Sequence, residues 1–161
     1  MSREIVFDRD SLAVMTLVVG LVGLSHAGFT WPHAATIALF GGGAIVAFVA
    51  EAIVINRGLL HHHIDPKLVG VPVYVLLGWT GVVYIAFRVA LLWTNGWLAV
   101  GTGAVLATGY DALVDHRGVI AGAWTYTDDL PGPRFRGVPW WNYVGWFVIS
   151  SVTAALALPF L

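Results

Sequence analysis

The chain has 161 residues, of which 58% are hydrophobic and 11% are charged, and its formal net charge is −1. With a mean hydropathy of +0.82 it has too few polar side chains to cover a soluble globular protein, so the composition predicts an integral membrane protein. The near-neutral charge argues against nucleic acid as a partner, and the absence of cysteine excludes disulfides and thiolate metal sites.

Five apolar stretches are long enough to cross a bilayer as helices, which takes about 20 residues each. They cover residues 11–29, 34–55, 71–93, 97–115 and 139–160. Acidic residues precede the first stretch and no small-residue cleavage site follows it, so we expect a retained helix and not a signal peptide. The sequence therefore predicts an all-α, polytopic membrane helix bundle that forms one domain over residues 1–161.

The lysine and arginine residues predict the orientation of these helices. The N-terminus and the loops after the second and fourth helices must share one side of the membrane. That side holds Arg3, Arg9, Arg57, Lys67, Arg117, Arg134 and Arg136, whereas Arg88 lies in the third stretch. Because positive residues accumulate on the cytoplasmic side, we expect a cell-membrane protein with a cytoplasmic N-terminus and an external C-terminus.

Matching segments predict an internal duplication. Two pairs recur in the same order: EAIVINRG at 51–58 with DALVDHRG at 111–118, and GVPVYVLLGW at 70–79 with GVPWWNYVGW at 137–146. Repeat A then covers residues 34–93 and repeat B residues 97–160, with the first helix outside both. Since each repeat contains two helices, both copies are expected to insert the same way up.

In both copies a Gly-Val-Pro segment precedes an apolar stretch. Proline fits the first turn of a helix, so Pro72 and Pro139 are expected to start the third and fifth helices. A Gly-Trp pair follows about two turns later, where the glycine permits close approach of another helix. Trp79 and Trp146 should then lie at equivalent depths in the membrane; an interfacial aromatic belt is the alternative.

Three carboxyl groups are predicted to lie inside or near spanning segments. Asp111 occupies the place of Glu51 in the duplication, and Asp115 shares the helix face of Asp111. Ionisable residues in a membrane are costly and are functional candidates, and burial beside one another would keep one of them protonated. The alternative is structural pairing with Arg57 and Arg117.

The segment HHHIDP at residues 61–66 contains three successive histidines, which cannot all face one centre on a helix or strand. We therefore expect no metal site here. Instead we expect one histidine, assigned to His63, to reach the mouth of a cavity. The chain also lacks a G-x-S-x-G motif, a phosphate-binding glycine loop and a Rossmann fingerprint.

Several motifs taken together resemble a known family. They are Glu51, GVPVYVLLGW at 70–79, GYDALVD at 109–115, GAWTY at 122–126 and GVPWWNYVGW at 137–146. In this order they look like the carotenoid biosynthesis membrane proteins of the CruF type, which are carotenoid hydratases of archaea and bacteria. Members of that family are typically longer, so the chain resembles a compact version of them.

The resemblance implies addition of water, without a cofactor, to a terminal carbon–carbon double bond of an acyclic carotenoid end group. Carboxyl groups could supply the proton and activate the water, and aromatic rings could stabilise the carbocation between these steps. The candidate catalytic residues are Glu51, Asp111 and Asp115. The candidate substrate-binding residues are Trp79, Tyr84, Trp124, Asn142, Trp146 and His63.

Other functions stay open at this point. An acid could also catalyse cyclisation or isomerisation of the same substrates, and the chain could be a non-catalytic carotenoid-binding or assembly subunit. A small proton-coupled transporter built on the repeat is a further alternative. The expected partners are membrane lipid and the carotenoid substrate, and self-association or a partner membrane subunit could complete the site.

Overall fold

The computed structural model describes residues 8–161, so Arg3, on which the predicted orientation partly rests, lies outside the described residues. It confirms a mostly helical chain with five helices, in the part described, that are long and apolar enough to span a membrane. The first span is α1 (Arg9–Thr30). The second span consists of α2 (His33–Ile37), the π-helical η1 (Ala38–Gly42) and α3 (Gly43–Asn56), which follow one another without a break. The third span is α4 (Val73–Ala90), the fourth is α5 (Gly96–Ile120), and the fifth is α6 (Trp140–Ala157) continued by the 3-10 turn η2 (Leu158–Phe160).

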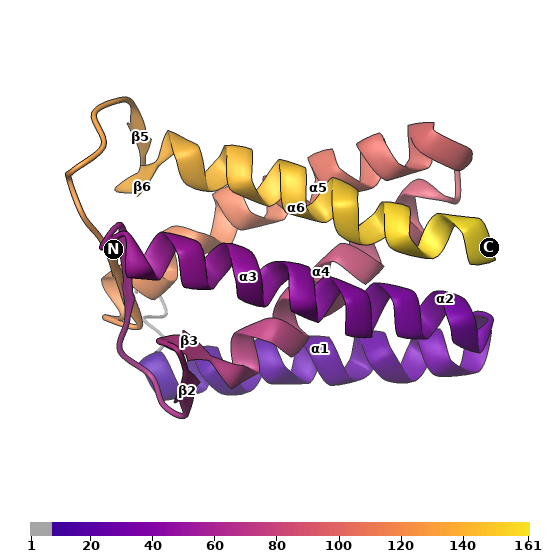
Figure 1. Cartoon of the computed structure of the whole chain (residues 1–161), viewed down its shortest axis with the longest axis horizontal. Helices are drawn as coiled ribbons and strands as arrows, with labels where there is room; N and C mark the ends of the chain where they lie inside the picture. The colour runs from indigo at the N-terminus through magenta and orange to yellow at the C-terminus, as the bar shows by residue number, and fades with distance from the viewer. Residues whose placement is uncertain (1–7) are drawn as a thin grey trace, which may run out of the picture.

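Six short strands occupy the two loops that follow α3 and α5. They are β1 (Leu60–His62), β2 (Lys67–Leu68), β3 (Val71–Pro72), β4 (Trp124–Tyr126), β5 (Arg134–Phe135) and β6 (Val138–Pro139). The prediction of an all-α fold missed them, because each is too short to give a period-two pattern. We call the end of the bundle that carries them the strand end; the C-terminus lies at the opposite end (Figure 1).

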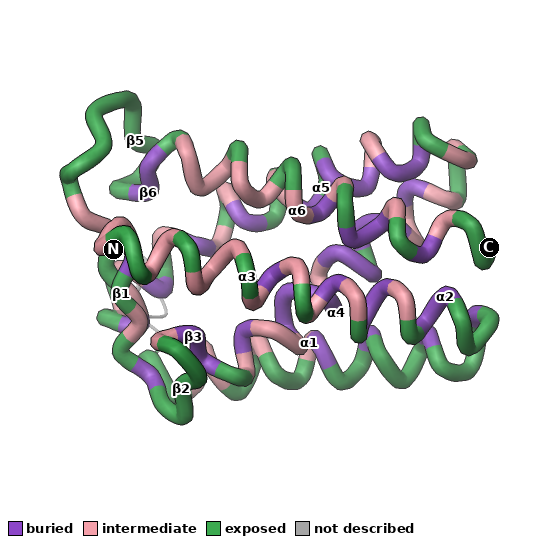
Figure 2. The backbone as a smooth tube through the Cα atoms, in the orientation of Figure 1, coloured by how far each residue is buried: buried purple, intermediate pink, exposed green. Residues whose placement is uncertain are grey.

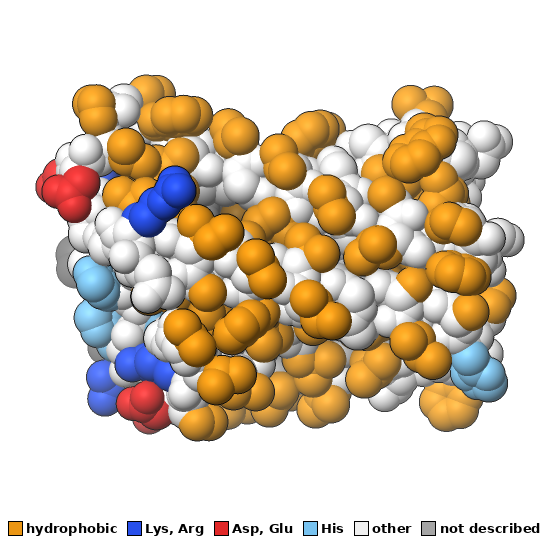
Figure 3. All heavy atoms as spheres, in the orientation of Figure 1, with side chains coloured by type: hydrophobic (Ala, Val, Ile, Leu, Met, Phe, Trp, Pro, Cys, Tyr) orange, Lys and Arg blue, Asp and Glu red, His pale blue; other side chains and the backbone are white. Residues whose placement is uncertain are grey.

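The charged side chains also distinguish the two ends of the bundle. On the face shown in Figure 3, the Lys, Arg, Asp and Glu side chains gather at the strand end, and hydrophobic side chains cover much of the rest. Arg88 lies in the last turn of α4, which runs away from the strand end. The loops after the second and fourth spans therefore share one end of the bundle, as the sequence predicts.

The most buried helix is α4, which packs against α1, α3, α5 and α6 (Figure 2). Its contact with α1 depends on glycines, since a Cβ atom on Gly81 would lie 2.6 Å from the Cα atom of Gly20. Gly78 meets the backbone and side chain of Thr16 in the same way, which confirms the predicted close approach at the first Gly-Trp pair. At the second pair, a Cβ on Gly145 would have no neighbour within 4 Å.

Each Gly-Val-Pro segment forms one arm of a β-hairpin, in which β2 pairs with β3 and β5 pairs with β6. The two turns share their backbone conformation: φ is 52° at Val69 and 82° at Gly70, and 52° at Arg136 and 86° at Gly137. Two successive positive φ angles are typical of the type I′ turns that join antiparallel strands tightly. The two loops thus repeat the same local structure.

The hairpins change the predicted helix starts. Pro72 and Pro139 are N-caps in extended conformation, and the helices begin at Val73 and Trp140. The prediction placed the prolines within the helices; it was wrong because each Val-Pro pair is held in its hairpin by the preceding strand. A further difference concerns α5, which continues to Ile120 and so extends beyond the predicted end at residue 115.

A third sheet joins the two loops to each other. Strands β1 and β4 pair antiparallel, with Leu60 opposite Tyr126 and His62 opposite Trp124. Because β1 closely follows α3 and β4 closely follows α5, this pairing holds side chains from both loops against the ends of both helices. It positions the polar residues of the candidate site.

Candidate functional site

A cavity of about 180 Å³ lies between α1, α4 and α5 and is closed by β1 and β4 at the strand end. Glu51, Asp111 and Asp115 all line it. Asp111 and Asp115 are buried, with 2% and 8% of their surface exposed, because both face the bundle interior from the same side of α5. The structure therefore brings together the three carboxyl groups that the sequence singled out.

Asp111 is held by α6. The side-chain amide of Asn142 donates a hydrogen bond from Nδ2 to Oδ2 of Asp111, with a distance of 2.9 Å. Asn142 lies in the first turn of α6, so the hairpin that starts this helix also sets the depth of the amide. Asn142 lines the cavity beside the acids, and its hydrogen bond to Asp111 joins α6 to α5.

Asp115 is held by the loop sheet. The hydroxyl of Tyr126, on β4, donates to Oδ2 of Asp115 at 3.0 Å. Burial raises the pKa of Tyr126 well above its usual range, and the neighbouring negative charges of Asp115 and Asp111 act in the same direction. The phenol therefore keeps its proton and remains a donor to the carboxylate.

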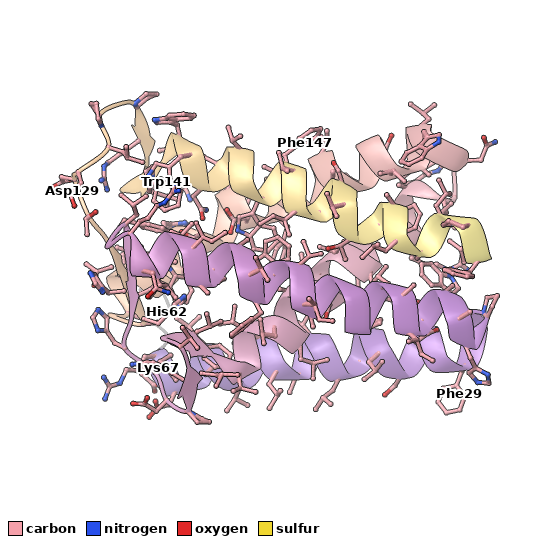
Figure 4. The ribbon with its side chains drawn as sticks, in the orientation of Figure 1. Phe29, His62, Lys67, Asp129, Trp141 and Phe147 are labelled. Carbon is pink, nitrogen blue, oxygen red and sulfur yellow. The ribbon has the colours of Figure 1, made fainter. Side chains whose placement is uncertain are left out.

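Glu51 meets a histidine from β1. The distance from Nε2 of His62 to Oε2 of Glu51 is 3.4 Å, and both side chains are largely buried. The prediction of His63 at the cavity mouth was wrong: His63 is exposed and its Nε2 meets the hydroxyl of Thr125, whereas His62 lines the cavity. Figure 4 shows His62 and Trp141, from the first turn of α6, at the strand end.

The three cavity acids have no arginine partner within residues 8–161. Within the described residues, no Lys or Arg nitrogen lies within 4.0 Å of a carboxylate oxygen of the three cavity acids. The structural alternative, in which Glu51 pairs with Arg57 and Asp111 with Arg117, is therefore not found, although Arg117 lies in the cavity wall. Polar partners without a fixed positive charge surround the carboxyl groups instead.

Indole rings form the apolar side of the cavity. Trp79 of α4 and Trp146 of α6 stack with their ring centroids 4.2 Å apart and their planes at 26°. The two Trp side chains thus meet within the bundle, where Trp79 is buried and Trp146 is half-buried; their depth in a membrane stays a prediction. Trp124 of β4 also lines the cavity, and Gly118 leaves the room that its indole ring occupies.

Tyr84 lies apart from this group. It is buried toward the opposite half of α4, where its hydroxyl is 2.6 Å from Nδ1 of His26 and its ring packs edge-on against Trp31. It does not line the cavity, so the structure gives no support to the predicted substrate contact. His62 and Tyr126 line the cavity but were not among the predicted site residues. The GAWTY motif, which contains Tyr126, was the sequence feature that could have identified this tyrosine.

A second hollow of about 110 Å³ lies between α3 and α6. It shares five lining residues with the first cavity: Glu51, Leu60, Trp79, Asn142 and Trp146. Glu51 and the indole pair therefore border both hollows, whereas Asp111 and Asp115 border the first. Among residues 8–161, no group of three or more His, Asp or Glu side chains is arranged to hold a metal ion.

A family model described as "Carotenoid biosynthesis protein" matches residues 11–160. No curated protein and no solved structure gives a significant match to this chain. The matched range contains the five spanning helices, apart from the first two residues of α1, and every residue of the cavity described above. The chain therefore belongs to the carotenoid biosynthesis protein family.

Proposed function

We propose that the protein is a carotenoid hydratase, which adds water to a terminal double bond of an acyclic carotenoid end group. The observation that carries this proposal is the sharing of one cavity by three carboxyl groups, without a Lys or Arg partner within the described residues, and a stacked indole pair. Three negative charges close together in a largely buried site, faced by one histidine and two neutral donors, would be costly, so at least one carboxyl group holds a proton. An acid then lies beside a base.

The proposed reaction balances without a cofactor. A carboxylic acid donates its proton to the less substituted carbon of the double bond, and the π electron pair forms the new C–H bond. The neighbouring carbon becomes a tertiary cation, to which a water oxygen bonds while a second carboxylate accepts the proton that the water releases. One alkene and one water give one tertiary alcohol, with no oxidant or reductant.

The indole pair supports the cationic step. The faces of tryptophan rings attract cations, by about 2 kcal/mol or more where the site is desolvated. Trp79 and Trp146 both border the two hollows, so the reacting carbon can lie against an indole face in either space. Asn142, which already holds Asp111, is placed to orient the attacking water.

We also propose that the strand end faces the cytoplasm. Apart from Arg88, the Lys and Arg residues of the described chain lie in the loops and helix ends at the strand end, which is the asymmetry expected of cytoplasmic segments. Water would reach the acids from that side, past His62. The carotenoid, which dissolves in the bilayer, would enter from the lipid.

The predicted duplication belongs to the same proposal. It is supported by the equal turn conformations of the two hairpins and by the contact of the two Gly-Trp pairs. Because each repeat supplies one carboxyl group at the same sequence position, Glu51 and Asp111, duplication explains how the acids came to share a site.

Expression in a host that accumulates an acyclic carotenoid tests the function directly. Mass spectrometry of the extracted pigment should show a product heavier by one water molecule. A product of unchanged mass would indicate cyclisation or isomerisation instead. An unchanged pigment that co-purifies with the protein would indicate a binding or assembly subunit.

A further inference from the structure

The two hollows have matching walls. Ala50, Glu51 and Val54 of α3 line the second hollow, and their counterparts in the matched segments, Tyr110, Asp111 and Val114 of α5, line the first. Both hollows also contact the same indole pair. The site thus consists of two equivalent half-cavities that meet at the pair of tryptophans.

The correspondence extends to the other helix of each repeat. Gly145, Trp146 and Ile149 of α6 line the second hollow, whereas their counterparts Gly78, Trp79 and Val82 of α4 line the first. The helices around the two half-cavities are therefore arranged alike, and the differences between them come from what lies outside the repeats.

Helix α1 makes that difference. Leu12, Met15, Thr16 and Val19 of α1 form one wall of the first half-cavity, and Gly78 is in direct contact with Thr16. No part of the described chain takes the corresponding place beside α6, since a Cβ on Gly145 would meet no heavy atom within 4 Å. Figure 1 shows α3 and α6 side by side with no other helix in front of them. Helix α1 therefore covers one side of the first half-cavity, and no helix of the described chain covers the corresponding side of the second.

A second helix packed as closely as α1 would not fit on this open side. The contact between α1 and α4 requires Gly81, whose Cβ would lie 2.6 Å from Gly20. The counterpart of Gly81 in α6 is Val148, a larger residue that is 51% exposed. A helix on this side would therefore lie farther from α6 than α1 lies from α4. The hollow that remains is lined by apolar residues except for Glu51 and the side chain of Asn142, which suits an extended hydrocarbon chain.

We propose that the hollow between α3 and α6 is the entrance from the lipid and the binding groove for the extended isoprenoid chain of the substrate. The chain lies beside Gly145, and its end group passes the indole pair to reach the carboxyl groups. This inference rests on the proposed function, because it assumes that a long apolar substrate reacts at those groups.

Substitutions at Gly145 test the groove. Because space is open at this position, alanine, leucine and phenylalanine should fill the hollow progressively without displacing the backbone. Carotenoid retained by the purified protein should fall in that order, by about tenfold for Gly145→Phe, which corresponds to about 1.4 kcal/mol of binding free energy. A short hydrocarbon of two isoprene units with the same end group should still be hydrated, since it needs little of the groove.

Gly101→Phe is the matched control, because Gly101 lies on α5, has no heavy atom within 4 Å of its Cβ position and lines neither hollow. It should retain pigment like the wild type. Equal retention by Gly145→Phe, or a wild type that retains no carotenoid, would overturn the inference. If Gly145→Phe is not monodisperse, Gly145→Leu decides in its place. Pigment retention that depends on residue 145 without any hydration would disprove the proposed function but leave the groove intact.

Discussion

The side chains of Trp79 and Trp146 stack at a centroid distance of 4.2 Å, although they belong to different helices and to different halves of the sequence. Each follows a Gly-Val-Pro hairpin at the same spacing, so the two hairpins place the rings at one depth. The stack forms a wall that both hollows share. The rings thus lie where a cationic intermediate beside the acids would need an electron-rich surface.

Replacement of one ring should slow the reaction. Trp146→Leu removes an indole face and should lower turnover by about tenfold, whereas Trp146→Phe keeps an aromatic face and should lose less. Turnover is measured as hydrated carotenoid formed per amount of folded protein. Trp97→Leu serves as a control because Trp97 is 73% exposed and lines neither hollow. Wild-type turnover in Trp146→Leu would show that the ring has no part in the chemistry.

The histidine segment gives a second prediction. His62→Ala should lower kcat by about tenfold with little change in KM, because Glu51 loses the polar neighbour that holds it at the mouth of the cavity. His63→Ala is the matched control, and it should behave like the wild type because His63 is exposed and outside the cavity. Equal effects of the two substitutions would rule out a specific role of His62.

The buried phenol of Tyr126 predicts a dependence of stability on alkaline pH. Its pKa is raised in the folded protein by burial, so above about pH 10 the unfolded chain loses this proton while the folded protein keeps it. The free energy of unfolding should therefore fall as the pH rises through this range, and it should fall less steeply in Tyr126→Phe. Denaturant unfolding in detergent at several pH values measures both slopes. Parallel curves for the two proteins would contradict the assignment.

The spanning helices were predictable because length and apolar character alone determine them. The predicted helix starts differ from the observed ones where the loops fold back as hairpins. The helix starts at Val73 and Trp140 depend on hairpin strands of two residues each, which leave no periodic signal. The acids were also predictable, since a carboxyl group in an apolar segment is costly wherever it points. The matched positions of Glu51 and Asp111 were the basis for predicting that these two acids lie together.

The remaining site residues depended on contacts between distant segments. The choice between His62 and His63 follows from the pairing of β1 with β4, which turns alternate side chains of β1 toward the cavity. Neither strand could be paired from sequence alone. Tyr84 was misplaced for a different reason: it follows Trp79 by more than one helical turn, which moves it away from the acids and toward His26.

In the proposed function, the carboxyl group of Asp111 takes part directly in hydrating a carotenoid. Asp111→Asn keeps the size of the side chain and an oxygen that accepts from Asn142, so the fold and the retained pigment should be unchanged. Mass spectrometry of pigment from cells expressing this variant should show hydrated product reduced by about 100-fold or more relative to the wild type, because the amide can neither donate nor accept the proton. Hydration at the wild-type rate by folded Asp111→Asn protein would contradict the account.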